Sequence, residues 1–259
     1  MSASAPFSPP QQRLRNSRVR MGASLLGALA FLWLLGELLA PLPAPIGPAA
    51  QQFVDGARTT VSLTLVSGVL GLGIGLALGL GKMAESTWLR LPSEFIIWII
   101  RGTPLLTQLL FFYLAMPALL PGLQWSEYWT AVAALAINVG AYNAEVFRAG
   151  VQSVPRGQLM AARALGMRPS QAFRFVVLPL ALRVSLPSLA NNVVALLKDS
   201  SLAYAIGVVE INMIAQRVQA DSFQPVPVFI TTAVIYLILT TALTQFSTAL
   251  EERMAASPR

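Results

Sequence analysis

Long apolar runs, separated by short polar segments, make up most of the chain. A helix of about 20 apolar residues is long enough to cross the hydrocarbon core of a bilayer. The pattern predicts an all-α transmembrane fold with six helical spans between two polar tails, residues 1–20 and 251–259, the first of them disordered. The six predicted spans cover residues 21–41, 54–81, 94–116, 129–149, 185–209 and 227–250.

The longest polar interruption between two apolar runs covers residues 155–179. Pro155 suits the first turn of a helix, and Gly166 lets the backbone leave that helix. Pro169 is typical of the start of a second short helix, which Pro179 is predicted to end. No acidic residue occurs in this segment, and its four arginines are Arg156, Arg163, Arg168 and Arg174. A helix–bend–helix unit of this kind, with a small apolar face, is predicted to dock a cytoplasmic partner.

The distribution of positive charge predicts the orientation. Basic segments between spans lie on the cytoplasmic side of the membrane. Placing residues 155–179 there puts both termini of a six-span chain in the cytoplasm, and only Arg58 and Arg217 then lie clearly outside. A cleaved signal peptide is the alternative for residues 21–41, because a basic segment precedes this apolar run. The length of the run and the proline-rich APLPAP after it favour a retained span.

The second span contains the glycine-rich stretch GLGIGLALGLGK. It does not fit the phosphate-binding loop, because Met83 follows Lys82 where that loop has Ser or Thr. Small residues recur at every fourth position, at Ser67, Gly71, Gly75 and Gly79. Such a stripe lets two helix backbones approach closely, so we expect it to pack against another helix rather than to bind a ligand.

The segment 101–104 (RGTP) interrupts the third span near its first third. Pro104 removes a helical hydrogen bond, which weakens the helix at this point. Arg101 needs a partner or an interfacial position, because a charge inside the membrane is costly. Deeper in the span, Thr107 and Gln108 are predicted to line a translocation path or to bond a neighbouring helix.

The second half of the fourth span is unusually polar. Asn138, Tyr142 and Glu145 lie four and three residues apart, so they share one face of the helix. That face is costly to expose to lipid. Two interpretations of Glu145 remain open: it pairs with Arg148 within the helix, or its carboxylate meets the ammonium group of a substrate.

The fifth span also carries charges. Adjacent residues on a helix point about 100° apart, so Lys198 and Asp199 should each face a cavity or a partner helix. Asn192 adds a hydrogen-bonding group one to two turns earlier. We predict that the region of Lys198, Asp199, Ser200 and Ser201 serves a translocation path or its gate. A purely structural buried ion pair is the alternative.

Composition limits the available chemistry. The chain of 259 residues is 55% hydrophobic and only 11% charged, which is too apolar for an average soluble domain. It has no cysteine and no histidine, which removes thiol chemistry and the commonest metal ligand, and we expect no metal site and no catalytic residue. The net charge of +7 is spread over loops at the membrane edge, which indicates topology rather than nucleic-acid binding. Residues 210–224 are predicted to form an external loop.

The spacing in residues 155–179 resembles the coupling-loop signature of ATP-binding-cassette importer permeases. The resemblance rests on Ala161 and Ala162, Gly166, Val176, and Leu178 followed by Pro179. In that family the loop seats in a groove on the ATPase subunit. The resemblance implies that the coupling residues are Gly157, Met160, Ala161, Ala162, Arg163, Leu165, Gly166 and Met167. One departure is Met160, which stands where the family has an acidic residue.

Three further segments resemble the polar-amino-acid branch of the same family: RGTPLLTQL, AYNAE-FR and KDSSL. The resemblance covers residues 59–250, so the first span is an addition to a five-helix core. It implies a permease subunit of a bacterial inner-membrane importer of polar amino acids that works by alternating access. The implied partners are two ATPase subunits that use ATP, a second permease chain, identical or homologous, and an extracytoplasmic binding protein. This chain itself would bind no cofactor.

Other functions fit the same pattern. An ion-coupled secondary transporter would use Glu145 and Asp199 for coupling. An assembly subunit would use its polar residues only to fasten helices. A permease of the same family for another small solute, such as an opine, is the alternative within the family.

Overall fold

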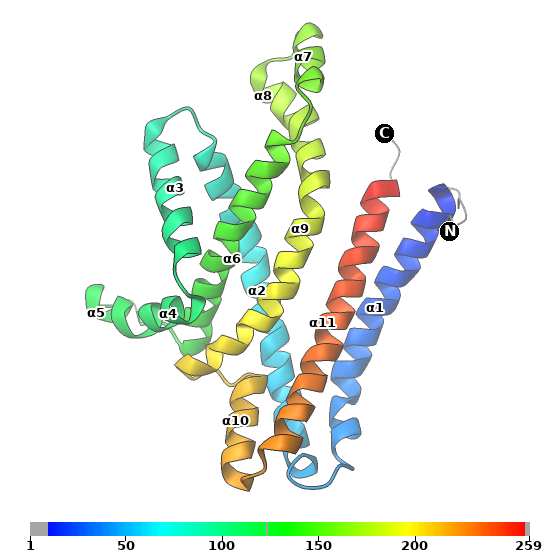
Figure 1. Cartoon of the computed structure of the whole chain (residues 1–259), viewed down its shortest axis with the longest axis vertical. Helices are drawn as coiled ribbons and strands as arrows, with labels where there is room; N and C mark the ends of the chain where they lie inside the picture. Colours follow the sequence, from blue (N-terminus) through cyan, green and yellow to red (C-terminus); the bar gives the residue numbers. More distant parts are fainter. Residues whose placement is uncertain (1–9, 123, 257–259) are drawn as a thin grey trace, which may run out of the picture.

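The computed structural model describes residues 10–122 and 124–256, and every regular element in these ranges is a helix (Figure 1). Five helical segments are long and apolar enough to cross a membrane, and a bent pair makes a sixth. The predicted all-α transmembrane class is therefore confirmed. The long helices are α1 (Pro10–Leu39), α2 (Ala50–Lys82), α6 (Glu127–Gln152), α9 (Leu178–Asp199) and α11 (Pro225–Ala256).

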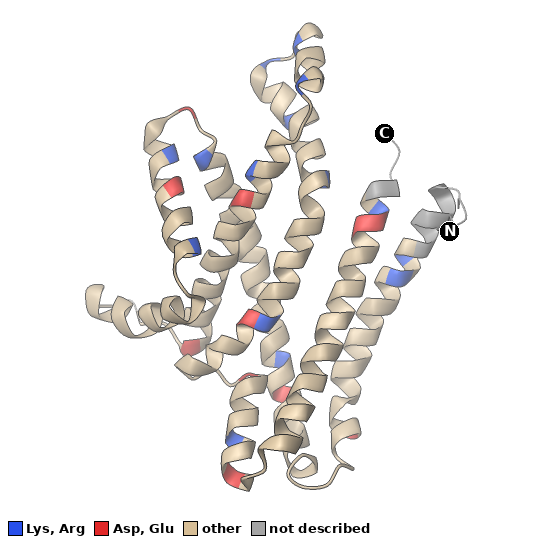
Figure 2. Ribbon diagram, viewed as in Figure 1, with Lys and Arg blue, Asp and Glu red and all other residues tan. Residues whose placement is uncertain are grey.

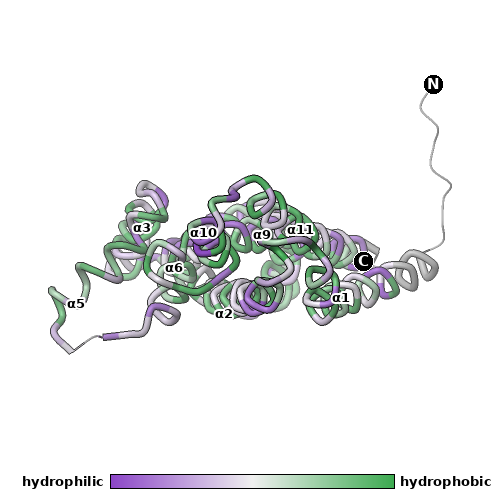
Figure 3. Tube along the Cα trace, turned by 90° about the horizontal axis from the view of Figure 1, so that it is seen from below, coloured by the Kyte–Doolittle hydropathy of each residue, from purple (hydrophilic) through white to green (hydrophobic). Residues whose placement is uncertain are grey.

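Shorter helices connect them. They are η1 (Gly47–Ala49), α3 (Thr87–Gly102), α4 (Leu105–Leu110), η2 (Phe111–Ala115), α5 (Met116–Leu119), α7 (Arg156–Ala164), α8 (Pro169–Ala172), η3 (Phe173–Val177), η4 (Ser200–Ile206) and α10 (Ile211–Ser222). Seen from the end, the spans form an elongated row with α5 and α1 at opposite ends (Figure 3). The hairpin of α7 and α8 lies at the same end of the molecule as the start of α1 and the end of α11 (Figure 1).

The core of the fold is the contact between α2 and α6. The small-residue stripe of α2 is buried against α6, where a Cβ atom on Gly71 would meet Val139 and one on Gly75 would meet Asn143. The hydroxyl of Ser67 donates to the carbonyl of Val132 at 3.4 Å. The predicted packing role of the stripe is therefore confirmed, and the close approach fixes the position of the polar face of α6.

The first helix begins earlier than expected. Helix α1 already includes residues 10–20, so the prediction of a disordered tail is wrong for these residues, while residues 1–9 lie outside the described ranges. The helix packs along α11, and the guanidinium of Arg20 lies 2.8 Å from the carboxylate of Glu252. At its other end, Leu35 and Leu39 join a hydrophobic core with Phe53 of α2. The helix extends back to Pro10 because residues 11–20 contain no proline or glycine that would break it.

The third predicted span is broken rather than continuous. The chain bends by 111° between α3 and the helical segment Leu105–Leu119, which begins with α4, and Thr103 and Pro104 are extended between them. Proline favours an extended residue before it and supplies no N–H, so the RGTP segment turns the chain instead of kinking one helix. The predicted interruption of the third span at RGTP is therefore present, but as a complete break between two helices, 87–102 and 105–119, rather than a weak point within one helix over 94–116.

The second short helix of the basic segment does not end at Pro179. A π-helical turn, η3, joins α8 to α9, so residues 169–206 form one long helical segment. Pro179 lies in the first turn of α9, where a missing N–H is tolerated, and Pro187 lies inside α9. The predicted stop at Pro179 and the predicted start of the fifth span at residue 185 are both wrong.

Residues 210–224 are not a simple external loop. Helix α10 fills most of this range, with Ile211, Ile214, Ala215 and Val218 buried. These four residues sit at helical spacing, which gives the segment an apolar face that packs against α2 and α11.

Candidate functional site

The break between α3 and α4 is held by Gln108. Its amide nitrogen donates to the carbonyl of Ile100 at 2.7 Å and to the hydroxyl of Thr103 at 2.9 Å. Its carbonyl oxygen accepts from the Asn138 amide on α6 at 3.0 Å. These bonds satisfy a backbone carbonyl freed by the break, which non-helical backbone in a membrane requires. Gln108 therefore bonds a neighbouring helix, and it fixes the broken segment against α6.

A cavity of about 330 Å³ lies beside this break, between the α3–α4 connection, α6 and α9. It brings together side chains from three separate segments. Four residues predicted from the sequence line it: Asn138, Tyr142, Asn192 and Asp199. Thr103 and Pro104 of the break complete the polar edge, so the sequence prediction and the cavity coincide at these positions.

Lys198 and Asp199, the two charged residues of α9 near this cavity, point to different sides of the helix. Asp199 faces the cavity, while Lys198 is exposed on another side of α9. Within the described ranges no Lys or Arg nitrogen lies within 4.0 Å of the Asp199 carboxylate. The alternative of a buried Lys198–Asp199 ion pair is therefore wrong for this structure, and Asp199 presents an unpaired carboxylate to the cavity.

Three other predicted residues lie outside the lining of this cavity. Ser200 is buried, and its hydroxyl donates to the carbonyl of Leu197 at 2.8 Å. Ser201 is half-buried, and Thr107 is exposed. Their positions give them no direct access to the cavity.

Asn192 forms an amide pair with Asn143, a residue that the sequence did not identify as a site residue, and this pair connects the core helices. Asn192 donates to the side-chain oxygen of Asn143 at 2.9 Å, and Asn143 donates to the carbonyl of Gly71 at 3.4 Å. The signal for Asn143 was its place in the polar half of the fourth span. The pair links α9 to the tightly packed α2–α6 core.

Glu145 is the centre of a cationic cluster. One carboxylate oxygen lies 2.5 Å from the Lys82 ammonium, and the other lies 2.8 Å from Arg148. Arg101 approaches the first oxygen at 3.8 Å, and its guanidinium stands 5.3 Å from the centre of the Tyr142 ring. The predicted pairing of Glu145 with Arg148 is therefore present. The structure also gives Arg101 its partner.

The cluster has an excess of positive charge, with three cations around one carboxylate. Each oxygen of Glu145 already accepts one hydrogen bond from a cationic side chain, so a further cation would compete with Lys82 and Arg148 for the carboxylate. Lys82 was missed as a site residue because it lies 63 positions from Glu145 in the sequence and no local spacing relates them. Arg101, Glu145 and Arg148 line a separate cavity of about 630 Å³, together with Ser153 after the end of α6 and Ser185 and Ser188 of α9. Figure 2 shows that Lys and Arg are more frequent in the half of the molecule that holds the basic hairpin.

The basic segment forms the expected helix, bend and helix. Gly166 adopts a left-handed conformation with φ of 76°, directly after α7. The amide of Met167 then donates to the carbonyl of Ala162 at 3.2 Å, which closes the end of α7. Met160 and Leu165 expose 65% and 79% of their surface, whereas Ala162 is buried. Two large apolar side chains at a basic tip are typical of a docking surface.

Glu210 is a buried acid that the sequence analysis did not identify. Its carboxylate accepts the backbone N–H of Asn212 and of Met213 at the start of α10, at 2.9 Å and 2.8 Å. It also accepts the hydroxyl of Tyr236 at 2.8 Å. Burial opposes its ionisation and raises the pKa of Glu210 to about 7, although these three hydrogen bonds act in the opposite direction.

This shift predicts a pH-dependent stability. Because the folded chain binds the Glu210 proton more tightly than the unfolded chain, protonation of Glu210 stabilises the folded state. This contribution to the free energy of unfolding is complete below about pH 4.5 and is lost as the pH rises through about 7. The loss is roughly 3 kcal/mol, at about 1.4 kcal/mol per pH unit. We expect the unfolding midpoint in detergent to fall between about pH 5 and about pH 8, and to fall less in Glu210→Gln.

The matched control is Asp221→Asn, an exposed acid at the other end of α10. It should keep the pH dependence of the unmodified chain. An equal pH dependence in Glu210→Gln would show that another group titrates.

Comparison with known proteins identifies relatives over most of the chain. A family model described as "Binding-protein-dependent transport system inner membrane component" matches residues 70–256. The octopine transport system permease protein OccM of Rhizobium radiobacter is 38% identical over 219 residues, which are 80% of this chain and 89% of that protein. The glutamine transport system permease protein GlnP of Escherichia coli K12 is 36% identical over 209 residues, or 81% and 95% of the two chains.

A solved structure has the same arrangement of helices. The crystal structure of an amino acid ABC transporter with histidines superposes with a TM-score of 0.75 at 34% sequence identity. The match covers 80% of this chain and 95% of the chain in that structure.

Proposed function

The chain belongs to the family of binding-protein-dependent transport system inner membrane components, and we propose that it is the permease subunit of an ATP-driven importer of polar amino acids. It is not itself an enzyme. The amino-acid substrate follows from two kinds of relative, the glutamine permease and the amino acid transporter whose fold it shares. We place it in a bacterial inner membrane, with α7, α8 and both termini in the cytoplasm, because the basic residues gather at that end.

One observation carries the proposal. The exposed tip around Gly166 leads directly into one helical segment that runs without a break from Pro169, through α8, η3 and α9, to Asp199 at the edge of the cavity beside the helix break. A continuous helical segment transmits a displacement along its length. A partner that pushes on Met160 and Leu165 would therefore move one wall of the cavity.

The family and this geometry support a set of partner chains. The proposed engine is a pair of ATPase subunits that bind the tip of α7 and α8 and use ATP. A second permease chain, identical or homologous, would complete the path, and an extracytoplasmic binding protein would deliver the substrate. ATP-driven closure of the ATPase pair would tilt α9 and open the cavity alternately to the two sides of the membrane.

We propose the cavity beside the break as the substrate site. Asp199 supplies an unpaired carboxylate for an ammonium group, and the amides of Asn138 and Asn192 supply hydrogen bonds. Gln108 positions the break that forms one wall. The predicted contact of Glu145 with a substrate ammonium stays a prediction, and the substrate would compete there with Lys82 and Arg148.

Uptake by proteoliposomes tests the function. Proteoliposomes that contain the complex of this chain, its ATPase and its binding protein should accumulate a radiolabelled polar amino acid. They should do so only when ATP is present on the side of the membrane where the ATPase lies. The chain alone should accumulate none. Uptake by the chain alone, collapsed by an uncoupler, would establish the ion-coupled transporter instead.

A second candidate substrate class is an opine, because the octopine transport system permease protein OccM is 38% identical to this chain. Octopine is an amino-acid derivative, so the same carboxylate and amides could bind it. Competition separates the two classes: an excess of unlabelled opine should leave amino-acid uptake unchanged if the complex transports amino acids only.

The coupling role of the bend gives a specific prediction. Gly166→Pro should leave membrane insertion and ATP hydrolysis intact but reduce uptake by about tenfold or more, because proline fixes φ near −65° and cannot keep the left-handed bend. The measurement is uptake and ATP hydrolysis by the same reconstituted complex.

The matched control is Gly166→Asn, because asparagine tolerates the left-handed conformation with the smallest penalty after glycine. It should retain most of the uptake. Full uptake by Gly166→Pro would remove the bend from the coupling mechanism.

A further inference from the structure

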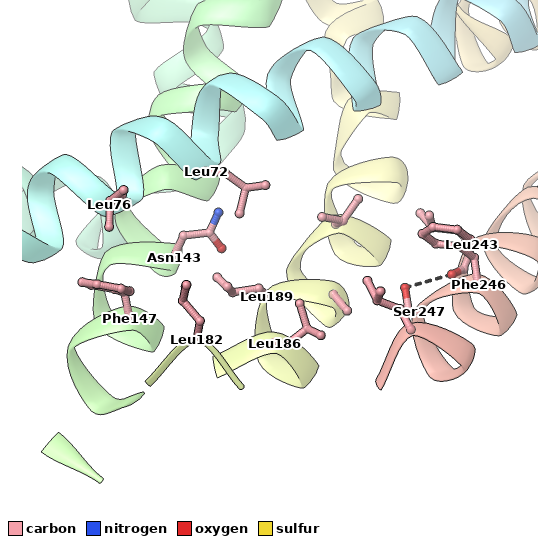
Figure 4. Close-up of a pocket in the computed structure, with 13 residues that line it drawn as sticks. Leu72, Leu76, Asn143, Phe147, Leu182, Leu186, Leu189, Leu243, Phe246 and Ser247 are labelled. Atoms are coloured by element: carbon pink, nitrogen blue, oxygen red, sulfur yellow. Dashed lines mark hydrogen bonds between the residues drawn. The ribbon is translucent and has the colours of Figure 1, made fainter. Parts of the chain in front are cut away.

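A second, apolar cavity of about 410 Å³ lies apart from the candidate site, between α2, α6, α9 and α11 (Figure 4). Leucines of α2 and α9 face it from one side, and Leu243 and Phe246 of α11 face it from the other. All of its lining residues belong to the segments that are long and apolar enough to span the membrane. The cavity therefore lies between membrane-spanning segments.

The two polar side chains in the lining are already satisfied within the protein. The hydroxyl of Ser247 donates to the carbonyl of Leu243 at 2.9 Å, as Figure 4 shows. Asn143 donates to the carbonyl of Gly71 and accepts from Asn192. A polar occupant would lose its own hydrogen bonds on entry and gain few in return. The lining therefore selects an apolar occupant.

The cavity is open to its surroundings. Leu72, Leu76 and Leu182 retain 42%, 42% and 41% of their exposed surface. In a bilayer, lipid reaches such an opening wherever the second permease chain does not cover it. The cavity separates α9, which packs on the core helix α6, from α11, which packs along α1.

A cationic side chain stands beyond the end of the cavity that is nearer α7. Arg253 follows Phe246 by seven residues, which places it two turns further along the same side of α11. It is exposed and has no ion-pair partner among the described residues, whereas its neighbour Glu252 is paired with Arg20. Guanidinium groups at the membrane edge bind phosphate well, because their donors match its geometry.

We propose that this cavity binds one acyl chain of a membrane phospholipid whose phosphate is held by Arg253. The chain fills the space between α9 and α11 and braces the outer pair, α1 and α11, against the core of α2, α6 and α9. The site is independent of the substrate cavity and of the transport function proposed above.

Photolabelling tests the site. The full chain would be placed in nanodiscs of phosphatidylethanolamine and phosphatidylglycerol that contain a phosphatidylglycerol with a diazirine in its acyl chain. We expect the label on peptides from residues 182–193 and 243–250. Ala190→Trp fills the cavity and should lower that labelling by about tenfold, since excluding even two methylene groups from an apolar slot weakens binding by that factor.

The control for the first variant is Leu237→Trp, on the exposed side of α11 away from the cavity, which should leave the labelling unchanged. Arg253→Gln should weaken retention of the phospholipid in native mass spectrometry, while Arg217→Gln on α10 should not. Equal labelling in Ala190→Trp and unmodified chain would overturn the proposal. So would a change of oligomeric state in Ala190→Trp without loss of lipid, which would assign the cavity to a second copy of the chain.

Discussion

Gly75→Leu is expected to prevent accumulation of folded protein. A Cβ atom at this position would meet the side chain of Asn143 and the backbone of Gly140 and Ala144, the backbone atoms at 3.0 Å and 3.2 Å. A flexible side chain can move aside, but the backbone of a neighbouring helix cannot move without separating α2 from α6. Overpacking alone costs about 1–3 kcal/mol, and loss of the Asn143 hydrogen bonds adds to it.

The same helix supplies a matched control. Gly73 lies two residues away on the exposed side of α2, and no atom lies within 4 Å of its Cβ position. Gly73→Leu should accumulate normally, because it adds an apolar group toward lipid. The measurement is the monodisperse fraction on size-exclusion chromatography in mild detergent. Equal yields of the two variants would mean that α2 and α6 do not approach as closely as the structure shows.

The contrast between these two glycines also explains what the sequence could predict. Every fourth residue of α2 is small, and this periodicity is a local signal that identifies a packing face without knowledge of the partner helix. The helix–bend–helix unit around Gly166 was predictable for the same reason, since glycine and proline act within one or two turns. Six spans and the polar face of α6 also follow from local pattern.

Features that the sequence could not predict depend on contacts between distant segments, or on whether a helix ends or continues at a proline. Lys82 and Glu145 meet because the glycine stripe brings α2 against α6, and no spacing in the sequence relates them. Pro179 reads as a stop, but the π-helical turn of η3 absorbs the change of register and the helix continues. The burial of Glu210 depends on α10 folding back against α2 and α11, which residues 210–224 alone do not reveal.

Glu145→Gln is expected to destabilise the permease and to abolish most uptake. Lys82 and Arg148 keep only 24% and 30% of their side-chain surface exposed, so removal of the carboxylate leaves two cations together in a largely buried place. Breaking such a pair by removing one partner costs about 3 kcal/mol or more. The exposed acid at the start of the same helix, Glu127, gives the control: Glu127→Gln should behave like the unmodified chain.

A double variant separates the structural role of Glu145 from a direct contact with substrate. If Glu145 balances charge, Glu145→Gln combined with Lys82→Gln should recover much of the stability and uptake, because it removes one charge of each sign. If the carboxylate instead binds the substrate ammonium, the double variant should fold but stay as defective in uptake as the single one, with a raised half-saturation concentration. The readouts are the unfolding midpoint in detergent and the concentration dependence of uptake at matched protein levels. Recovery of stability without uptake would assign Glu145 to the path itself, and Lys82 would then be the group that the substrate displaces.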